Sequence, residues 1–230
     1  LVTLGMLLVS WRYVWLITPL HRSVEVGDDS DLPVPLPDPL LDEHSQPVHR
    51  GTGPLFHRLF AVDIVDSPLT AAQLMDEVAT DLNQAVPAEV TAVDKISGHC
   101  DGLAVGDEVV VRLPGPWDGP VRVVHRTDTC FRFATLAGHL EAGQIEFRVG
   151  ADHRSLSFEI ESWARSGDRF SDLLYSHLRL AKEVQLHMWV SVAGKDADLA
   201  RGRSEGGVIV TTRRVDPAEA EPAVLRPGIR

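Results

Sequence analysis

One short stretch of the chain, residues 135–147, gathers side chains suited to acid–base or metal chemistry. It reads TLAGHLEAGQIEF and places His139, Glu141, Gln144 and Glu146 within eight positions, among glycines. A histidine and a carboxylate two residues apart can act as general base and acid, or can ligate a metal ion. His139 and Glu141 are therefore the candidate catalytic pair, in the manner of a hydrolase or a cyclase.

The surroundings of this pair favour a structural turn over catalysis. The turn AGHLEAG lies between two alternating stretches, so the two side chains need not converge. A zinc site needs a third and usually a fourth ligand besides His139 and Glu141. Glu146 does not supply it, because the alternation that places Ile145 and Phe147 in the core sends Glu146 to the opposite face. There Glu146 can pair with arginines of neighbouring strands, namely Arg122, Arg132 or Arg148. We expect no metal site, no cofactor and no catalysis, and we expect His139 to cap the turn by hydrogen bonding.

Alternation of apolar and polar residues predicts a run of antiparallel strands around this turn. The predicted strands cover residues 55–65, 88–97, 105–113, 121–126, 130–136, 143–149 and 155–164. Ser67-Pro68 and Thr70 open a predicted helix over 71–85, and a long amphipathic helix is predicted over 168–192. At a rise of 1.5 Å per residue the long helix would extend about 37 Å, enough to cross a whole sheet.

These elements predict an α+β fold in which a curved antiparallel sheet wraps around the long C-terminal helix. The order of elements resembles the helix-grip fold of the START-like superfamily. Members of that superfamily often hold an apolar ligand between the sheet and the helix, and the resemblance implies such a cavity here.

A closer family resemblance rests on three motifs. They are GTG at 51–53, FRFATLAGHLEAGQIEF at 131–147, and SWARSG at 162–167 leading into a helix that carries KEVQ. Together they resemble the uncharacterised family known as domain of unknown function nineteen-ninety, found in actinobacteria and plants, over about residues 50–195. That family's pattern has acids where this chain has Gln144 and Ile145. The resemblance implies a START-like fold and no settled activity.

A helix-grip cavity would draw its lining from both the sheet and the long helix. His177 and Gln185 interrupt the apolar stripe of 168–192, and a buried polar side chain needs a partner such as a ligand, a water or a strand residue. Satisfied core residues are the alternative interpretation. The aromatic candidates for the lining or its rim are Trp163, Trp189 and Phe133. We predict non-catalytic binding of an apolar or amphipathic, lipid-like small molecule. The alternatives are an enzyme using His139 and Glu141, and a protein-interaction scaffold.

The N-terminal residues predict a membrane anchor. Residues 1–20 are apolar except for Arg12, and a stretch of 20 residues is long enough to span a bilayer. The stretch also carries Trp and Tyr residues typical of the headgroup interface. We predict an N-terminal apolar helix over 1–22 that spans the membrane once, the alternative being a helix packed on the domain. The basic residues His21 and Arg22 would place the main domain on the cytoplasmic side.

Two further segments flank the predicted domain of residues 51–195. Five prolines between 33 and 47 predict an extended linker over 23–50. Glycine, proline and charge predict a flexible tail over 196–230, in which GGVIVTTRRV could form a short strand. The net charge of −11, without any lysine-rich run, argues against nucleic-acid binding, because duplex binding depends on many contacts from Lys and Arg to phosphate.

Overall fold

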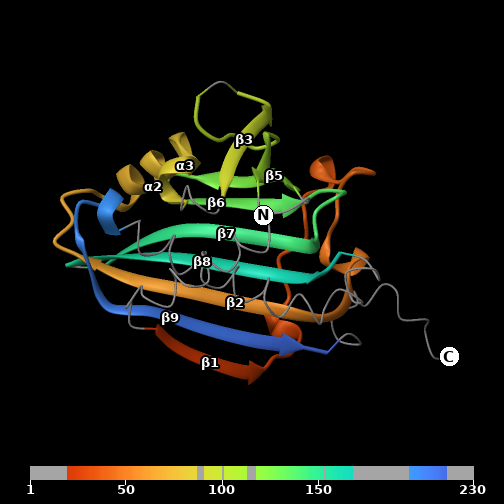
Figure 1. Cartoon of the computed structure of the whole chain (residues 1–230), viewed down its shortest axis with the longest axis horizontal. Coiled ribbons are helices and arrows are strands. Elements are labelled where there is room, and N and C mark those ends of the chain that lie inside the picture. The colour runs from red at the N-terminus through yellow and green to blue at the C-terminus, as the bar shows by residue number, and fades with distance from the viewer. Residues whose placement is uncertain are drawn as a thin grey trace, which may run out of the picture.

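The structure, a computed structural model, describes residues 20–86, 91–99, 101–112, 118–152, 154–167 and 197–216 (Figure 1). They form one curved, open nine-stranded sheet in the order β1-β9-β2-β8-β7-β6-β5-β4-β3. The strands are β1 (Leu20–Val26), β2 (Thr52–Val65), β3 (Ala92–Ser97), β4 (Glu108–Arg112), β5 (Asp118–Thr127), β6 (Cys130–Thr135), β7 (Glu141–Asp152), β8 (Ser155–Ser166) and β9 (Arg203–Val215). All neighbours are antiparallel except β1 and β9, so the prediction of a wholly antiparallel sheet is wrong at that edge.

The helix predicted over 71–85 is present as two pieces, α2 (Ala71–Thr80) and α3 (Leu82–Ala85). Thr70 caps α2 in a reciprocal capping box with Gln73, as its position before the apolar repeat indicates. Asp81 ends α2 with an extended backbone, and its carboxylate then accepts the amide proton of Asn83 at the start of α3. Figure 1 shows both helices at one end of the sheet.

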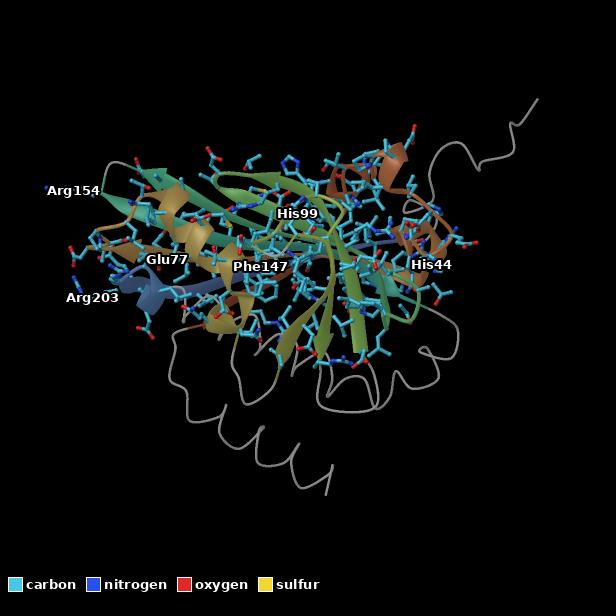
Figure 2. The ribbon with its side chains drawn as sticks, turned by 90° about the horizontal axis from the view of Figure 1, so that it is seen from above. His44, Glu77, His99, Phe147, Arg154 and Arg203 are labelled. Carbon is cyan, nitrogen blue, oxygen red and sulfur yellow. The ribbon has the colours of Figure 1, made fainter. Side chains whose placement is uncertain are left out.

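Period-two alternation gives the sheet one apolar face, which we call the inner face. Its side chains join those of α2 in a single buried cluster that includes Phe60, Val62, Phe131, Phe147, Phe158 and Ile160. The opposite side is called the outer face. Figure 2 shows Phe147, an inner-face residue of β7, within the body of the molecule. The alternation predicted for Ile145, Phe147 and Val149 is confirmed by this packing.

Residues 27–51, which we call the covering segment, pack against the outer face and do not form the predicted linker. The amide of Gln46 donates to the Thr135 carbonyl at 2.9 Å, and the Ala137 amide donates to the His44 carbonyl at 2.7 Å. Apolar residues next to the prolines supply the packing: Leu36 and Leu40 pack with Val124 and Ala134, and Leu32 and Val48 pack with Leu55, Trp163 and Val215. Prolines keep the backbone extended, but they do not prevent the leucines beside them from being buried.

Residues 203–215, predicted to belong to a flexible tail in which GGVIVTTRRV could form a short strand, form the interior strand β9 between β1 and β2. Val208 and Val210 are fully buried on the inner face, because the stretch alternates with period two. Gly206 and Gly207 adopt positive φ angles of 73° and 80°, next to an irregularity in the pairing of β9 with β2. Glycine tolerates positive φ angles, so the two glycines that suggested a flexible tail instead allow the strand to continue through the irregularity.

The described residues include only a small part of the two helices predicted at the ends of the domain. Residues 20–22, predicted to end the apolar N-terminal helix, are the first residues of β1. The remainder of that helix, and the predicted helix 168–192, lie outside the described residues. Among the residues that the structure describes, no helix is both long enough and apolar enough to cross a bilayer.

Candidate functional site

The inner face carries an aromatic cluster where β6 and β7 meet. Phe131 stacks on Phe147 with ring centroids 4.7 Å apart, and Phe133 meets both rings edge-on at 5.3 and 6.2 Å. The strand register causes this arrangement, because Phe131 lies directly opposite Phe147 and Phe133 opposite Ile145. Phe133, a predicted ligand-lining residue, thus lies on the apolar side of the sheet.

Trp163, another predicted ligand-lining residue, lies on the other side of the sheet from Phe133. It alternates with the inner-face residues Phe158 and Ile160 of β8 and so projects outward. Its ring stacks on His57 at 5.3 Å with an interplanar angle of 8°, and the Arg132 guanidinium lies 5.9 Å from its centroid. A ligand on the inner face would therefore not meet Trp163.

The three other predicted ligand-lining residues, His177, Gln185 and Trp189, lie outside the described residues. Their role in binding stays a prediction. Within the described part of the chain, the inner face is built from the strands, from α2 and α3, and from Ala197 and Ala200.

His139 holds the turn between β6 and β7 together. Its Nδ1 accepts the amide proton of Glu141 at 2.9 Å, and its ring lies against Gly119, where the Cβ of any larger residue would come within 3.2 Å of Nε2. Burial lowers the pKa of His139, although the charge of Glu141 opposes this shift. The Glu141 carbonyl oxygen also lies 3.0 Å from Nδ1, so the backbone of Glu141 contacts this ring atom through both its amide and its carbonyl group.

The covering segment fixes the same turn from outside. The side-chain amide of Gln46 donates to the carbonyls of His139 at 3.0 Å and Glu141 at 3.1 Å, and the Gly143 amide donates to the Gln46 carbonyl at 3.1 Å. The geometry of His139 and Glu141 is thus that of a braced turn, and it favours the structural interpretation of this pair over the catalytic one.

Among the surface hollows of the described residues are two whose lining includes no predicted site residue. One, of about 290 Å³, is lined by Ala72, Gln73, Asp76, Arg126 and Asp128, and the other, of about 240 Å³, lies beside the β7–β8 turn and includes Ile64, Leu69 and Arg154. The described residues also include no group of three or more His, Cys, Asp or Glu side chains placed to hold a metal ion.

Charged side chains pair across the outer face from strand to strand. Glu146 accepts from Arg132 at 2.6 Å and pairs with Arg148 at 3.1 Å. Arg148 continues to Glu159 and Glu161 on β8, both at 2.6 Å. The predicted pairing of Glu146 with Arg132 and Arg148 is confirmed, whereas Arg122 pairs instead with Asp42 and Glu108. These charges do not all face water, since Glu146 is only 7% exposed.

His57 continues this network toward β9 and was not identified from the sequence. Its Nδ1 lies 2.8 Å from Asp31 of the covering segment, and its Nε2 lies 2.7 Å from Glu161. Asp31 also receives a hydrogen bond from Arg213 at 3.3 Å. The sequence does contain a signal, because His57 and Arg58 interrupt the otherwise apolar stretch LFHRLFAVDIV, but it does not show which acids lie nearby.

The carboxylates set the protonation of His57. Burial alone would lower the pKa of His57, but hydrogen bonds from the ring to Glu161 and Asp31, together with their charges, outweigh burial and raise it. Burial would raise the pKa of Glu161, yet the bonds from His57 and Arg148 hold that pKa below its usual value. The arrangement is an imidazolium between two carboxylates, which joins the covering segment to the sheet.

The chain is similar to one protein family and to several solved structures. The model of a family described as a domain of unknown function, DUF1990, matches residues 77–195, which is more than half of the 230-residue chain. No curated protein matches. Among solved structures, norcoclaurine synthase from Thalictrum flavum is similar at 12% identity and a TM-score of 0.48, covering 70% of this chain and 95% of that one. The major latex-like protein 151 from Panax ginseng is similar at 13% identity and a TM-score of 0.39, covering 58% and 97%. The chain belongs to the DUF1990 family, as its motifs in the β6–β7 region predicted.

Proposed function

We propose that the inner face of the sheet binds an apolar or amphipathic small molecule without catalysis. The observation that carries this proposal is the aromatic cluster of Phe131, Phe133 and Phe147 on a continuous apolar face. Small-molecule sites in proteins are mostly apolar and aromatic, with a few polar groups that orient the ligand. A START-like cavity between this face and the predicted helix 168–192 is part of the proposal.

A matched pair of aromatic variants tests the proposal. Phe133→Ala removes an inner-face ring and Trp163→Ala removes an outer-face ring, and both parent side chains are nearly buried. With dansyl-undecanoic acid as the fluorescent probe, we expect Phe133→Ala to weaken binding about tenfold, the loss of one aromatic contact. Trp163→Ala should leave binding nearly unchanged.

Native mass spectrometry of the full chain purified from its host supplies a second readout. A co-purifying mass of lipid size supports the proposal. Absence of any bound mass, together with no saturable binding of the dansyl probe, would overturn it. Retained binding in Phe133→Ala with loss in Trp163→Ala would place the ligand on the outer face and would also contradict the proposal.

Attachment to a membrane through residues 1–20 is a separate proposal that rests on their composition. Flotation of the full chain with liposomes, compared with a chain that begins at residue 20, tests it. Equal flotation of the two chains would contradict the anchor.

A further inference from the structure

Most basic side chains in the described residues have a polar partner there, and two of those that pair with no carboxylate lie together at one corner of the inner face. Lys95 and most of the arginines pair with carboxylates, and Arg50 and Arg165 donate to backbone carbonyls. Arg58 and Arg214, both within strands, pair with no carboxylate of the described residues. In a chain of net charge −11, two neighbouring arginines of this kind present a local positive site.

The strand register brings these two arginines together on the ligand side of the sheet. Arg58 follows the same alternation as the inner-face residues Phe60 and Val62, and it lies opposite Thr212 of β9. Arg214 lies opposite Phe56, two positions along from Thr212, so Arg58 and Arg214 are diagonal neighbours. The Arg58 guanidinium rests 5.1 Å from the centre of the Phe56 ring, which holds it over the sheet.

Two hydroxyl groups complete the polar corner. Ser162 of β8 and Thr212 of β9 flank Arg58 directly on either side, and both are 7% exposed. Neither hydroxyl donates a hydrogen bond to a described residue. The corner therefore offers two guanidinium groups and two hydroxyl donors, a set that recognises carboxylate or phosphate oxygens.

The same row of the sheet leads from this corner to the aromatic cluster. Ser162 pairs with Ile145 of β7, and Ile145 pairs with Phe133 of β6. From Arg58 to Phe133 the row crosses three strand spacings, or about 14 Å at roughly 4.8 Å each. The polar donors therefore lie at one end of this row of the sheet, and the apolar side chains lie at the other end.

We propose that the ligand of the inner face is an amphiphile with a single anionic head group, held at Arg58 and Arg214, with its apolar tail lying toward Ile145 and Phe133. This inference rests on the proposed function, since it names the class of ligand for the same face. Ser162 and Thr212 orient the head group, and Phe133 contacts the tail.

The test compares an acid with its neutral analogue on the full chain. Dansyl-undecanoic acid and its methyl ester share one tail and differ only in the charge of the head. We expect the acid to bind at least about tenfold more tightly, the effect of charge-assisted hydrogen bonds. Palmitate and hexadecyl phosphate should both displace the probe better than hexadecanol, and their relative strength separates carboxylate from phosphate as the head group.

The variant Arg58→Gln with Arg214→Gln should bring acid and ester to nearly equal affinity. The control is Arg154→Gln, which removes one positive charge from an exposed arginine beside the β7–β8 turn, at the opposite end of β8 from Ser162. Figure 2 shows Arg154 at the edge of the molecule. We expect this control to keep the wild-type preference for the acid.

The outcomes separate this inference from the proposed function. Equal binding of acid and ester by the wild-type chain overturns the inference and leaves ligand binding intact, and it needs no variant. An unchanged preference in the folded double variant also overturns it. No saturable binding of either probe overturns the proposed function itself.

Discussion

The two faces of the sheet use charge in opposite ways. On the outer face, Arg132, Glu146, Arg148 and Glu161 pair with one another across the strands, and residues 27–51 cover part of them. On the inner face, Arg58 has no carboxylate partner among the residues that the structure describes. Paired charges beneath a covering segment hold parts of the chain together, whereas a cation without a carboxylate beside an apolar surface is suited to an anionic ligand.

The largest effect is expected from the centre of the inner face. Phe131→Ala removes a fully buried ring that contacts Phe133 and Phe147, and we expect a loss of about 3–5 kcal/mol in the free energy of unfolding. Urea denaturation measures it. As a control, Ile209→Ala changes an exposed apolar residue of β9 and should have an effect within about 0.5 kcal/mol. Similar losses for both variants would mean that the inner face is not the core.

A smaller loss is expected when the outer-face network is broken at Glu146. Glu146→Ala leaves Arg132 without its carboxylate partner and should cost about 2 kcal/mol, less than for a fully buried pair because Arg148 keeps Glu159 and Glu161. The exposed pair of Glu25 with Arg213 supplies the control, since Glu25→Ala should cost far less. Replacing both partners, as Arg132→Met with Glu146→Leu, should recover part of the loss. If the double variant is less stable than Glu146→Ala, an apolar pair cannot replace this charged pair, and the charges contribute more to stability than their local pairing.

The contact between the covering segment and the sheet should depend on pH through His57. The pKa of His57 is raised in the folded chain, so its stabilising contribution is complete below its ordinary value of about 6.5 and is lost as the pH rises through the folded value. The pKa values of Asp31 and Glu161 are lowered, so their contribution is complete above about pH 4.5 and is lost in acid. We expect the contact to be most stable between about pH 4.5 and 6.5.

Urea midpoints between about pH 5 and 9 measure this dependence. His57→Gln should flatten the fall in stability above about pH 6.5 relative to the wild-type chain. The protection of residues 27–51 against hydrogen exchange, taken relative to the intrinsic exchange rate at each pH, should fall over the same pH range in the wild-type chain alone. An equal slope in the variant would show that His57 does not join the segment to the sheet.

The smallest effect is expected at the turn that first suggested catalysis. His139→Ala removes the acceptor of the Glu141 amide and should cost about 1 kcal/mol. His139→Asn offers a side-chain oxygen to the same amide and should recover part of this loss. If His139→Ala instead abolished a measurable hydrolysis without changing stability, that result would support a catalytic role for His139.

Local sequence patterns predicted the elements well where one face is apolar. Phe131, Phe147 and Phe158 alternate with charged residues, and this period-two pattern determines both the strand and the face that is buried. Thr70 before the apolar repeat of α2 marked the start of that helix. The ligand-lining role of Phe133 and Trp163 stays a prediction, and the sequence did not show that Phe133 lies on the inner face and Trp163 on the outer face.

The sequence by itself determined the alternating strands, the helix opened at Thr70, the outward pairing of Glu146 and the family of the chain. Only the tertiary structure decided where the two flanking segments belong, because the strands and the face that they pack against are formed by residues distant in sequence. His57 is the clearest case, since its partners lie 26 and 104 positions away in the chain. Arg58 and Arg214 likewise become neighbours only when β2 pairs with β9, since register across strands is set by side chains distant in sequence.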